Sequence, residues 1–368
     1  MVARAEPLKA LGVFPGERAV RLVERDPPRL ASPTDVRLRV LDVGVCGTDR
    51  EICRFEFGTP PAGADYLVLG HECLAEVVEV GAAVRGIAPG DLVVPAVRRP
   101  CPHDACAPCR TGRQDFCHTG DFVEHGIKGR HGFLAEEVVE DARYLYAVPR
   151  ALRDVAVLVE PLTVAEKALA QVRHVQERLG GERARRTAVV AGAGAVGILS
   201  AMTLAAAGFE TTVWSREPES DPRAELAAVA GVGYVPAARE SLPQLGRRLG
   251  NVDVLFEATG APSVAFQALE ALGHNGVLVL FGLPGARSAL EVDAAAVVRT
   301  LVLRNQLVLG TINAGRDAFE AAIADLSVFE TRWPGLLRRM ITGRSDIEGH
   351  AALLDGPLRG IKNVIAVG

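Results

Sequence analysis

The sequence contains little cysteine, no excess of basic charge and no long hydrophobic run, and each of these absences excludes a class of protein. Seven cysteines in 368 residues is an odd number for a disulfide framework. A formal net charge of −4 provides no basic stripe of the kind that nucleic-acid binding needs. The most apolar stretch, residues 188–208, is rich in glycine and alanine, which is typical of a buried α/β unit rather than a membrane span. We therefore expect neither a nucleic-acid partner nor a membrane partner.

The first residues, MVARAEPLKALGVFPGERAV, do not have the basic segment, apolar segment and cleavage site of a secretory signal. We expect a cytoplasmic location, where the environment is reducing and clustered cysteines usually bind metal. With 49% hydrophobic and 23% charged residues, the composition is that of an ordinary globular protein. The chain is long enough for two domains with cores of their own.

The hydrophobic pattern changes near residue 163. Residues 1–162 carry short β-branched runs, such as VRLRVLDVGV and AEVVEVG, separated by Gly, Pro and Asp, which predicts a β-rich domain. Apolar residues at helical spacing then predict a long amphipathic helix over 163–179. Strands and helices alternate beyond it, which predicts an α/β domain with a parallel, doubly wound sheet. The strands expected in this sheet are residues 188–191, 211–214, 252–257, 276–281 and 307–310.

A glycine-rich loop, GAGAVG, follows the first of these strands and opens a helix. Gly192 would make the tight turn, Gly194 would let a pyrophosphate approach the backbone, and Gly197 would let the helix pack close to the strand. Val196 lies in the same loop. A Gly-rich turn of an unrelated α/β fold is the alternative, but the strand before and the helix after the loop favour dinucleotide binding.

The end of the next strand indicates which dinucleotide is bound. NAD enzymes usually place an acidic residue there for the ribose hydroxyls, whereas an arginine can accept the 2′-phosphate of NADP. This strand runs into Ser215 and Arg216, which favours NADP. The alternative is that Arg216 is a solvated surface residue and Glu217 binds the ribose, so that both cofactors are used.

Four cysteines within seventeen residues form the clearest metal signal in the sequence. Four thiolates suit a closed tetrahedral zinc site, and a loop so rich in Pro, Gly and Asp cannot build a core of its own. A redox motif or vestigial cysteines are the alternatives. His103 could replace one thiolate, but we expect His103 and the adjacent His118 to face solvent. The four cysteines are Cys101, Cys106, Cys109 and Cys117.

A second candidate metal site is dispersed along the chain. GVCGTD supplies Cys46 and Thr48, GHE supplies His71 and Glu72, and LVEPL supplies Glu160. A thiolate, an imidazole and a carboxylate from separate loops are suitable ligands for a catalytic zinc with an open position. Each residue alone has an ordinary explanation: a buried small hydrophobe, a core hydrogen-bonding partner and an acid at a helix start.

These motifs, in this order, resemble those of the zinc-dependent medium-chain dehydrogenase/reductase superfamily. GVCGTDREI, VRRPCPHDACAPCRTGRQDFCHTGDFVEHGI and LVEPLTVAEKAL are similar to the glucose 1-dehydrogenase branch, and the similarity covers nearly the whole chain. The resemblance implies a GroES-like catalytic domain, residues 1–162 completed by 313–368. It also implies a Rossmann dinucleotide-binding domain, residues 163–312, and a homodimer or homotetramer.

The resemblance also implies roles for individual residues. Cys46, His71 and Glu160 match the ligands of the catalytic zinc, and Glu72 matches an acid that ligates the metal or sits beside it. Thr48 matches the hydroxyl that carries the substrate proton away.

Two further residues, Glu124 and Asn313, match positions that contact the sugar in this branch. The chain departs from the family pattern in two places: the first gap of the cysteine cluster is four residues instead of two, and Val97 stands where a polar sugar contact is usual.

We therefore expect a zinc-dependent oxidoreductase that transfers a hydride from C1 of an aldose to NADP or NAD and forms the lactone, with glucose as the first candidate. The alternatives are a dehydrogenase of another polyol or cyclitol and, from a different class, a non-catalytic dinucleotide-sensing protein. The intact set of Cys46, Thr48, His71 and Glu160 argues against a sensor, which needs neither an open zinc nor a relay hydroxyl.

Overall fold

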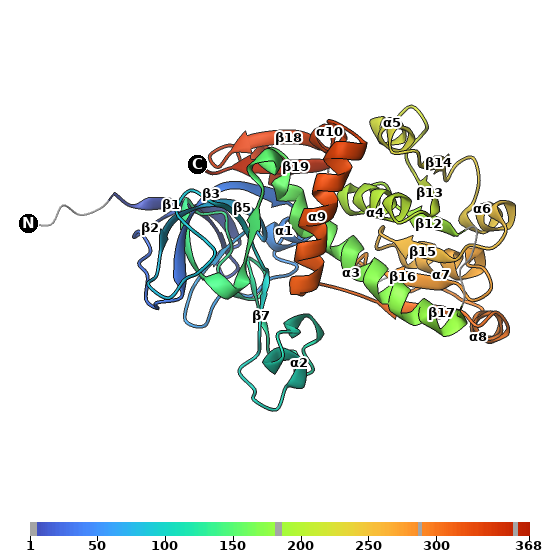
Figure 1. Ribbon diagram of the computed structural model, residues 1–368, viewed down its shortest axis with the longest axis horizontal. Coiled ribbons are helices and arrows are strands. Elements are labelled where there is room, and N and C mark those ends of the chain that lie inside the picture. Colours follow the sequence, from blue (N-terminus) through green and yellow to red (C-terminus); the bar gives the residue numbers. More distant parts are fainter. Residues whose placement is uncertain (1–5, 181–185, 286–288, 356–359) are drawn as a thin grey trace, which may run out of the picture. The chain divides into compact units, whose positions relative to one another are not determined.

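The computed structural model describes residues 6–180, 186–285, 289–355 and 360–368, which belong to two compact units (Figure 1). Unit 1 comprises Met1–Glu160, Asn313–Ser327 and Ile341–Gly368, and unit 2 comprises Pro161–Ile312 and Val328–Met340. The predicted domain boundaries 1–162, 163–312 and 313–368 differ from these units at residues 161–162 and 328–340, and they stay a prediction.

Unit 1 is rich in β-structure. Within the described residues, its largest sheet has the strand order β11-β6-β5-β3-β19-β18, with β10 paired to β3, and two smaller sheets run β2-β1-β4 and β7-β8-β9. The strands are β1 (Leu8–Phe14), β2 (Ala19–Arg25), β3 (Asp35–Val45), β4 (Leu67–Val68), β5 (Glu72–Val80), β6 (Leu92–Pro95), β7 (Arg98–Arg99), β8 (Val123–His125), β9 (Gly129–Arg130), β10 (Glu137–Asp141), β11 (Leu145–Val148), β18 (Ile341–Asp346) and β19 (Lys362–Ala366).

Strand β3 shows why the VRLRVLDVGV run forms the centre of this sheet. Its side chains alternate, so that Val36, Leu38 and Val40 are buried. On the other face, Arg37 and Arg39 donate to glutamates of the neighbouring strand β5, at 3.2 and 2.9 Å. Apolar burial on one face and cross-strand ion pairs on the other therefore fix both the pairing and the register.

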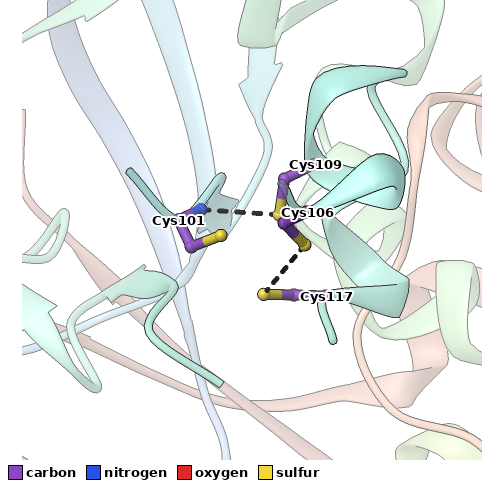
Figure 2. A group of neighbouring side chains, drawn as sticks. All are labelled: Cys101, Cys106, Cys109 and Cys117. Carbon is purple, nitrogen blue, oxygen red and sulfur yellow. Dashed lines mark hydrogen bonds between the residues drawn. The ribbon is translucent and has the colours of Figure 1, made fainter. Parts of the chain in front are cut away.

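A loop between β7 and β8 carries the four-cysteine cluster, and we call residues 101–117 the cysteine lobe. It contains the short helices α2 (Ala107–Arg110) and η1 (Gln114–Phe116) and lies apart from the larger sheets of unit 1 (Figure 1). The buried apolar cluster of the lobe consists of its own cysteines, which face one another in Figure 2. A segment with so little core needs another source of order.

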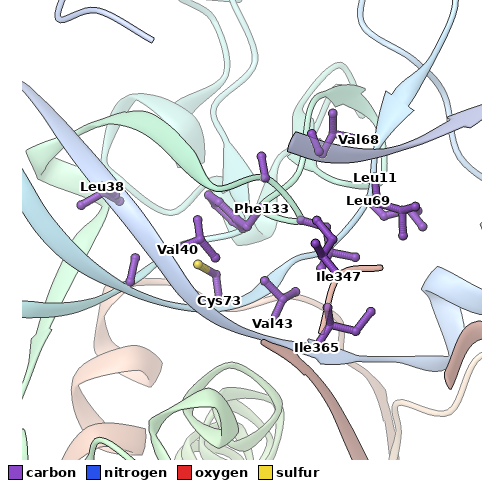
Figure 3. Packing of buried hydrophobic residues seen from close by; sticks show 14 of the residues in the cluster. Leu11, Leu38, Val40, Val43, Val68, Leu69, Cys73, Phe133, Ile347 and Ile365 are labelled. Carbon is purple, nitrogen blue, oxygen red and sulfur yellow. The ribbon is translucent and has the colours of Figure 1, made fainter. Parts of the chain in front are cut away.

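The core of unit 1 lies between its sheets and brings together residues far apart in the sequence (Figure 3). Leu11 of β1, Val43 of β3, Phe133 and Ile365 of β19 are all less than 1% exposed. Because Ile365 packs with residues from the first part of the chain, the C-terminal segment is an integral part of this unit. Truncating one such side chain to alanine typically costs about 2–5 kcal/mol.

Unit 2 contains a parallel sheet of six strands within the described residues, in the order β14-β13-β12-β15-β16-β17. The order reverses between β12 and β15, so right-handed crossovers place the helices that follow these two strands on opposite faces. The predicted fold class, a β-rich domain plus a doubly wound parallel sheet, is confirmed. The strands are β12 (Thr187–Ala191), β13 (Glu210–Ser215), β14 (Gly233–Pro236), β15 (Val254–Glu257), β16 (Val277–Leu280) and β17 (Leu307–Gly310).

The predicted amphipathic helix begins four residues earlier than expected. Helix α3 runs over Val159–Gln176 and is followed by the 3₁₀ turn η5 (Glu177–Leu179). Pro161 lies in its first turn, where a missing backbone N–H does no harm, so it does not delay the start of the helix.

The other helices are shorter, apart from the long helix α9. Among the described residues, no helix combines the length and the apolar character needed to cross a membrane. These helices are α1 (Gly47–Cys53), α4 (Ala195–Ala206), α5 (Pro222–Val229), α6 (Leu242–Leu249), α7 (Pro262–Ala271), α8 (Ala294–Leu303), α9 (Arg316–Arg332), α10 (Leu336–Met340) and α11 (Ala351–Leu354). The remaining 3₁₀ turns are η2 (Ala142–Tyr144), η3 (Arg150–Leu152) and η4 (Ala156–Leu158).

Candidate active site and metal centres

Three of the residues predicted for the dispersed metal site come together in unit 1. One ligand atom each from Cys46, His71 and Glu72 lies within 4.8 Å of the others, and both His71 and Glu72 are buried. Cys46 ends the loop between β3 and α1, and the other two residues lie at the start of the paired strand β5. The donor set of thiolate, imidazole and carboxylate suits zinc.

The loop that presents Cys46 also orients His71. Asp49, in the first turn of α1, accepts a hydrogen bond from the backbone N–H of Cys46 at 2.8 Å, and its other oxygen lies 3.4 Å from His71 Nδ1. Burial disfavours the His71 cation, but the charge of Asp49 outweighs it and raises the pKa of His71. With Nδ1 facing this carboxylate, Nε2 is left to bind a metal. Sequence reasoning missed Asp49, although it stands three residues after Cys46 in the same motif.

The carboxylate of Glu72 is bound by Lys362, a second residue that the sequence analysis did not identify. Lys362 of β19 is 4% exposed, and its Nζ donates to Glu72 Oε2 and, at 3.3 Å, to the carbonyl oxygen of Val45. Gly44 leaves room for this carboxylate, because a Cβ at that position would overlap Glu72 Oε2. No pattern in the GIKNV segment distinguishes Lys362 from a surface lysine.

Glu160 and Thr48 lie around this group without belonging to it. The carboxylate of Glu160 is not among the atoms that lie within 4.8 Å of one another. Burial, together with the nearby Glu72 charge, nevertheless raises the pKa of Glu160. The hydroxyl of Thr48, in α1, lies 3.9 Å from Cys46 Sγ.

The four cysteines of the lobe converge on one point (Figure 2). Their sulfur atoms lie within 4.8 Å of one another, and the sulfurs of Cys106 and Cys117 are 3.9 Å apart. Tetrahedral zinc with Zn–S bonds of about 2.3 Å requires sulfurs roughly 3.8 Å apart, so the arrangement fits zinc. The longer gap between Cys101 and Cys106 therefore does not prevent the four thiols from meeting.

Local hydrogen bonds favour thiolate in part of this cluster. Although burial opposes it, hydrogen bonds from Thr119 and Gly120 lower the pKa of Cys117 to about 6. The two nearby histidines are not part of the cluster: His103 pairs with Asp121 at 2.6 Å, and His118 is exposed.

The glycine-rich loop has the geometry that each of its glycines was expected to provide. Gly192 adopts a φ of 113°, which an L side chain rarely allows, and a Cβ on Gly197 would overlap the carbonyl oxygen of Gly192. Gly194 is the N-cap of α4. A Cβ built on this residue would have no atom within 4 Å, so the helix N-terminus is open to a ligand. Val196 lies in the first turn of α4. The loop therefore suits a pyrophosphate.

At the end of the next strand, both alternatives for the ribose are present. Ser215 is buried and its hydroxyl donates to Glu217, whose side chain is 22% exposed. Arg216 is 90% exposed, and its Nε donates to the same carboxylate at 2.9 Å. Tyr234 of β14 donates to the Glu217 carbonyl oxygen at 3.1 Å. Arg216 can therefore swing to a phosphate, while Glu217 is fixed at the strand end.

A cavity of about 390 Å³ lies at the carboxyl ends of β15, β16 and β17. In parallel sheets this edge is where ligands bind. Glu257, the last residue of β15, is 2% exposed and accepts from the backbone N–H groups of Thr259, at 2.7 Å, and Gly260, at 3.4 Å. Sequence reasoning did not single out these three residues, because FEATG carries no metal-ligand or phosphate-binding signature.

The residues expected to contact the sugar also meet in unit 1. Asn313 Nδ2 donates to Glu124 Oε1 at 3.1 Å, although the two residues are 189 positions apart. Arg98, next to the apolar Val97, donates to the same oxygen.

Two protein families match most of the chain. Residues 32–150 match the family described as the alcohol dehydrogenase GroES-like domain. Residues 153–367 match the family described as the glucose dehydrogenase C-terminus.

Relatives of known identity are similar over the whole chain. The glucose 1-dehydrogenase of Methanocella arvoryzae is 40% identical, covering 98% of this chain and 100% of the relative. That of Thermoproteus tenax is 42% identical, covering 91% of this chain and 92% of the relative. Among solved structures, a complex of Haloferax mediterranei glucose dehydrogenase with NADP, Zn and gluconolactone has a TM-score of 0.88 and 31% identity, covering 98% of this chain and 99% of that one.

Proposed function

Because this chain belongs to the glucose 1-dehydrogenase branch of the zinc-dependent medium-chain dehydrogenase/reductase superfamily, we propose that it oxidises an aldose at C1 to the lactone. Glucose is the first candidate for the substrate, and NADP is the hydride acceptor in preference to NAD. The similarity to the glucose dehydrogenase that binds NADP, Zn and gluconolactone supports both assignments.

The observation that carries the proposal is the convergence of Cys46, His71 and Glu72 on one point. Cys46, His71 and Glu160 would hold the catalytic zinc, with Glu72 beside it or as a further ligand. When bound, this zinc polarises the substrate hydroxyl and lowers its pKa. The four cysteines of the lobe would hold the structural zinc.

The chain's own residues position the reactants and move the proton. The carboxylate of Asp49, 3.4 Å from His71 Nδ1, would orient the imidazole so that Nε2 is free for the metal. Thr48 receives the proton of the substrate hydroxyl and passes it outward. Gly192, Gly194, Val196 and Gly197 hold the cofactor pyrophosphate at the start of α4.

Other residues set specificity. Ser215 and Arg216 bind the adenosine ribose and its 2′-phosphate, and Glu124 and Asn313 contact the sugar.

The GroES-like domain is residues 1–162 completed by 313–368, and the Rossmann domain is residues 163–312.

A substrate panel tests this function. Aldoses, polyols and cyclitols are offered with NADP and with NAD, and reduced cofactor is followed spectroscopically while the sugar product is identified. We expect the highest kcat/KM for glucose with NADP and a lactone product. Preferential oxidation of a polyol or cyclitol would contradict the proposal, as would cofactor binding without turnover of any hydroxyl compound.

Metal analysis tests the two zinc assignments. We expect about two zinc ions per chain from the two ligand sets. Chelation should abolish activity before it unfolds the protein, because an open site exchanges its ion more readily than a closed one. One ion per chain with full activity would contradict the catalytic assignment.

The oligomeric state and location complete the proposal. We expect a cytoplasmic homodimer or homotetramer. All seven cysteines are free thiols, which suits a reducing compartment. Val298, Val302 and Leu303 of α8 are 59–70% exposed, next to the edge strand β17, and an apolar surface of this kind favours self-association. Sedimentation analysis that finds a monomer at micromolar concentration would contradict the oligomer, and cell fractionation tests the location.

A further inference from the structure

Arg98 makes a contact with a proposed sugar-binding residue that the substrate assignment does not explain. It lies in β7 directly opposite Glu124 of β8, and its side chain is 5% exposed. Its Nε and one terminal nitrogen donate to Glu124 Oε1 at 3.0 and 2.9 Å. Asn313 Nδ2 donates to the same oxygen at 3.1 Å. Glu124 Oε1 therefore accepts three N–H bonds and has no capacity left for a ligand.

The other carboxylate oxygen has a different environment. Within the part of the chain that the structure describes, no protein group donates a hydrogen bond to Glu124 Oε2. This oxygen is also not one of the fully buried atoms, so part of its surface is exposed. The Glu124 side chain is 11% exposed. Oε2 is thus an accessible acceptor on a carboxylate whose orientation is fixed through its other oxygen.

The guanidinium of Arg98 is in turn held by Phe122 and by Asp115 of the cysteine lobe. Its Cζ lies 3.6 Å from the centre of the Phe122 ring, and its NH1 points to the carbonyl oxygen of Asp115 at 3.4 Å. A stacked, buried guanidinium has little freedom to turn. Because Arg98 contacts both the lobe and Glu124, the folding of the lobe fixes the direction of Glu124 Oε2.

We propose that Arg98 is a positioning residue for substrate recognition, which locks Glu124 so that Oε2 accepts a hydroxyl group of the sugar. This inference rests on the proposed function. The charge of Arg98 balances that of Glu124, so the pair presents a hydrogen-bond acceptor rather than a net negative charge. A neutral polyhydroxyl compound is the ligand that such a pair suits.

The test compares the parent protein with Arg98→Lys, Arg98→Met and Glu124→Gln on glucose and on its 2-, 3-, 4- and 6-deoxy analogues. With glucose we expect both Arg98 variants to raise KM about ten- to a hundredfold while kcat stays within about threefold. With the one analogue that lacks the hydroxyl bound by Oε2, the KM values of variant and parent should agree within about threefold. Glu124→Gln should lose sensitivity to the same hydroxyl.

A purely structural role would give a different pattern. An equal rise in KM for glucose and all four analogues, or a fall in kcat with unchanged KM, would overturn the inference while leaving the proposed function intact. If the parent protein oxidises no aldose, the proposed function fails and this inference fails with it.

Two further variants separate recognition from folding. Arg143→Met is the matched control: Arg143 also pairs with a carboxylate and lies over an aromatic ring, but it is 65% exposed and does not contact Glu124. It should leave every KM unchanged. Phe122→Ala keeps both Arg98 and Glu124 and should reproduce the selective KM pattern to a smaller degree, even if Arg98→Met does not fold. Zinc content and Tm of each variant report on the lobe.

Discussion

Among single residues, Thr48 is the one that we propose as the carrier of the substrate proton. It is half-buried in the first turn of α1, and its hydroxyl lies 3.9 Å from Cys46 Sγ. We expect Thr48→Ala to lower kcat about a hundredfold, because a proton-transfer step loses its positioned group. Stopped-flow and steady-state assays measure this, with Thr48→Ser as the variant that keeps the hydroxyl. Parent-like turnover by Thr48→Ala, with zinc content unchanged, would show that the hydroxyl carries no proton.

We also propose that a single side chain, Arg216, decides the choice between NADP and NAD. Arg216 follows β13. Among the residues that the structure describes, its guanidinium is bound by Glu217 alone, at Nε, so its terminal nitrogens can bond a 2′-phosphate. Arg216→Ala should weaken NADP binding about ten- to a hundredfold and leave NAD binding nearly unchanged. Calorimetric titration of both cofactors measures this.

Arg239 supplies the control for this measurement. It is 70% exposed and pairs with Glu219, and Arg239→Ala should bind both cofactors as the parent does. If the parent prefers NAD, the ribose is bound by Glu217 and the assignment to Arg216 is wrong. An equal loss of both cofactors in Arg216→Ala would instead give the arginine a role in supporting the loop.

Among the elements, the start of helix α4 carries two glycines, Gly194 and Gly197, for which we expect different roles. Gly194 should serve cofactor binding, and Gly197 should serve folding. Gly194→Ala places a methyl group in open space at a φ of −70°, so the free energy of unfolding should change by less than about 1 kcal/mol. NADP affinity should nevertheless fall at least about tenfold, because the methyl group occupies the approach of the pyrophosphate.

Gly197→Ala should do the opposite. Its Cβ would overlap the carbonyl oxygen of Gly192, and the variant should lose about 1–3 kcal/mol of stability even without cofactor. Urea denaturation and NADP titration of the two apo proteins test the pair. Equal stability of both variants would contradict the close helix–strand contact.

The elements also show what the sequence could and could not predict. The strand before the glycine loop and β17 were predicted because their apolar runs are bounded by clear turns. Strand β14, GYVP, was missed because a four-residue edge strand that contains glycine and proline has no periodic signal. Helix α3 begins at Val159 instead of residue 163, because its first turn contains a proline and a glutamate and so adds little to the apolar helical pattern.

The candidate site also contains residues that the sequence could predict and residues that it could not. Cysteines at short spacing and the glycine loop are local signals. The four cysteine sulfurs lie within 4.8 Å of one another, and a Cβ on Gly197 would overlap the carbonyl oxygen of Gly192. Lys362 and Arg98 are ordinary basic residues in the sequence, and their roles arise only when distant strands pair. Lys362 lies 290 positions from Glu72, which no local pattern can connect.

For the stability of the molecule, we expect His131 to introduce a dependence on pH. Its Nδ1 accepts the backbone N–H of Val68 at 3.1 Å, so protonation there would break a hydrogen bond. Burial, with the nearby charges of Arg25 and His125, lowers the pKa of His131 to about 4. The folded-state pKa lies below the unfolded value of 6.5. Neutral His131 therefore makes its full contribution to the free energy of unfolding above pH 6.5, and this contribution is lost as the pH falls toward 4.

Since His131 is only half-buried, the loss should be about 1–2 kcal/mol, less than the full shift implies. His131→Gln should remove this part of the pH dependence of the free energy of unfolding between pH 7 and 5. The exposed His174 provides the control, and His174→Gln should follow the parent curve. Parallel curves for the parent and His131→Gln would contradict the assignment.

The proposed reaction moves a hydride from C1 of an aldose to a nicotinamide cofactor. Glucose carrying deuterium at C1 is incubated with the zinc-loaded protein and NADP, and the products are analysed by mass spectrometry and NMR. We expect one deuterium per turnover at C4 of the reduced cofactor, together with an equivalent of gluconolactone that has lost its label. Reduced cofactor without deuterium, or no reduction of cofactor by any aldose, would contradict it.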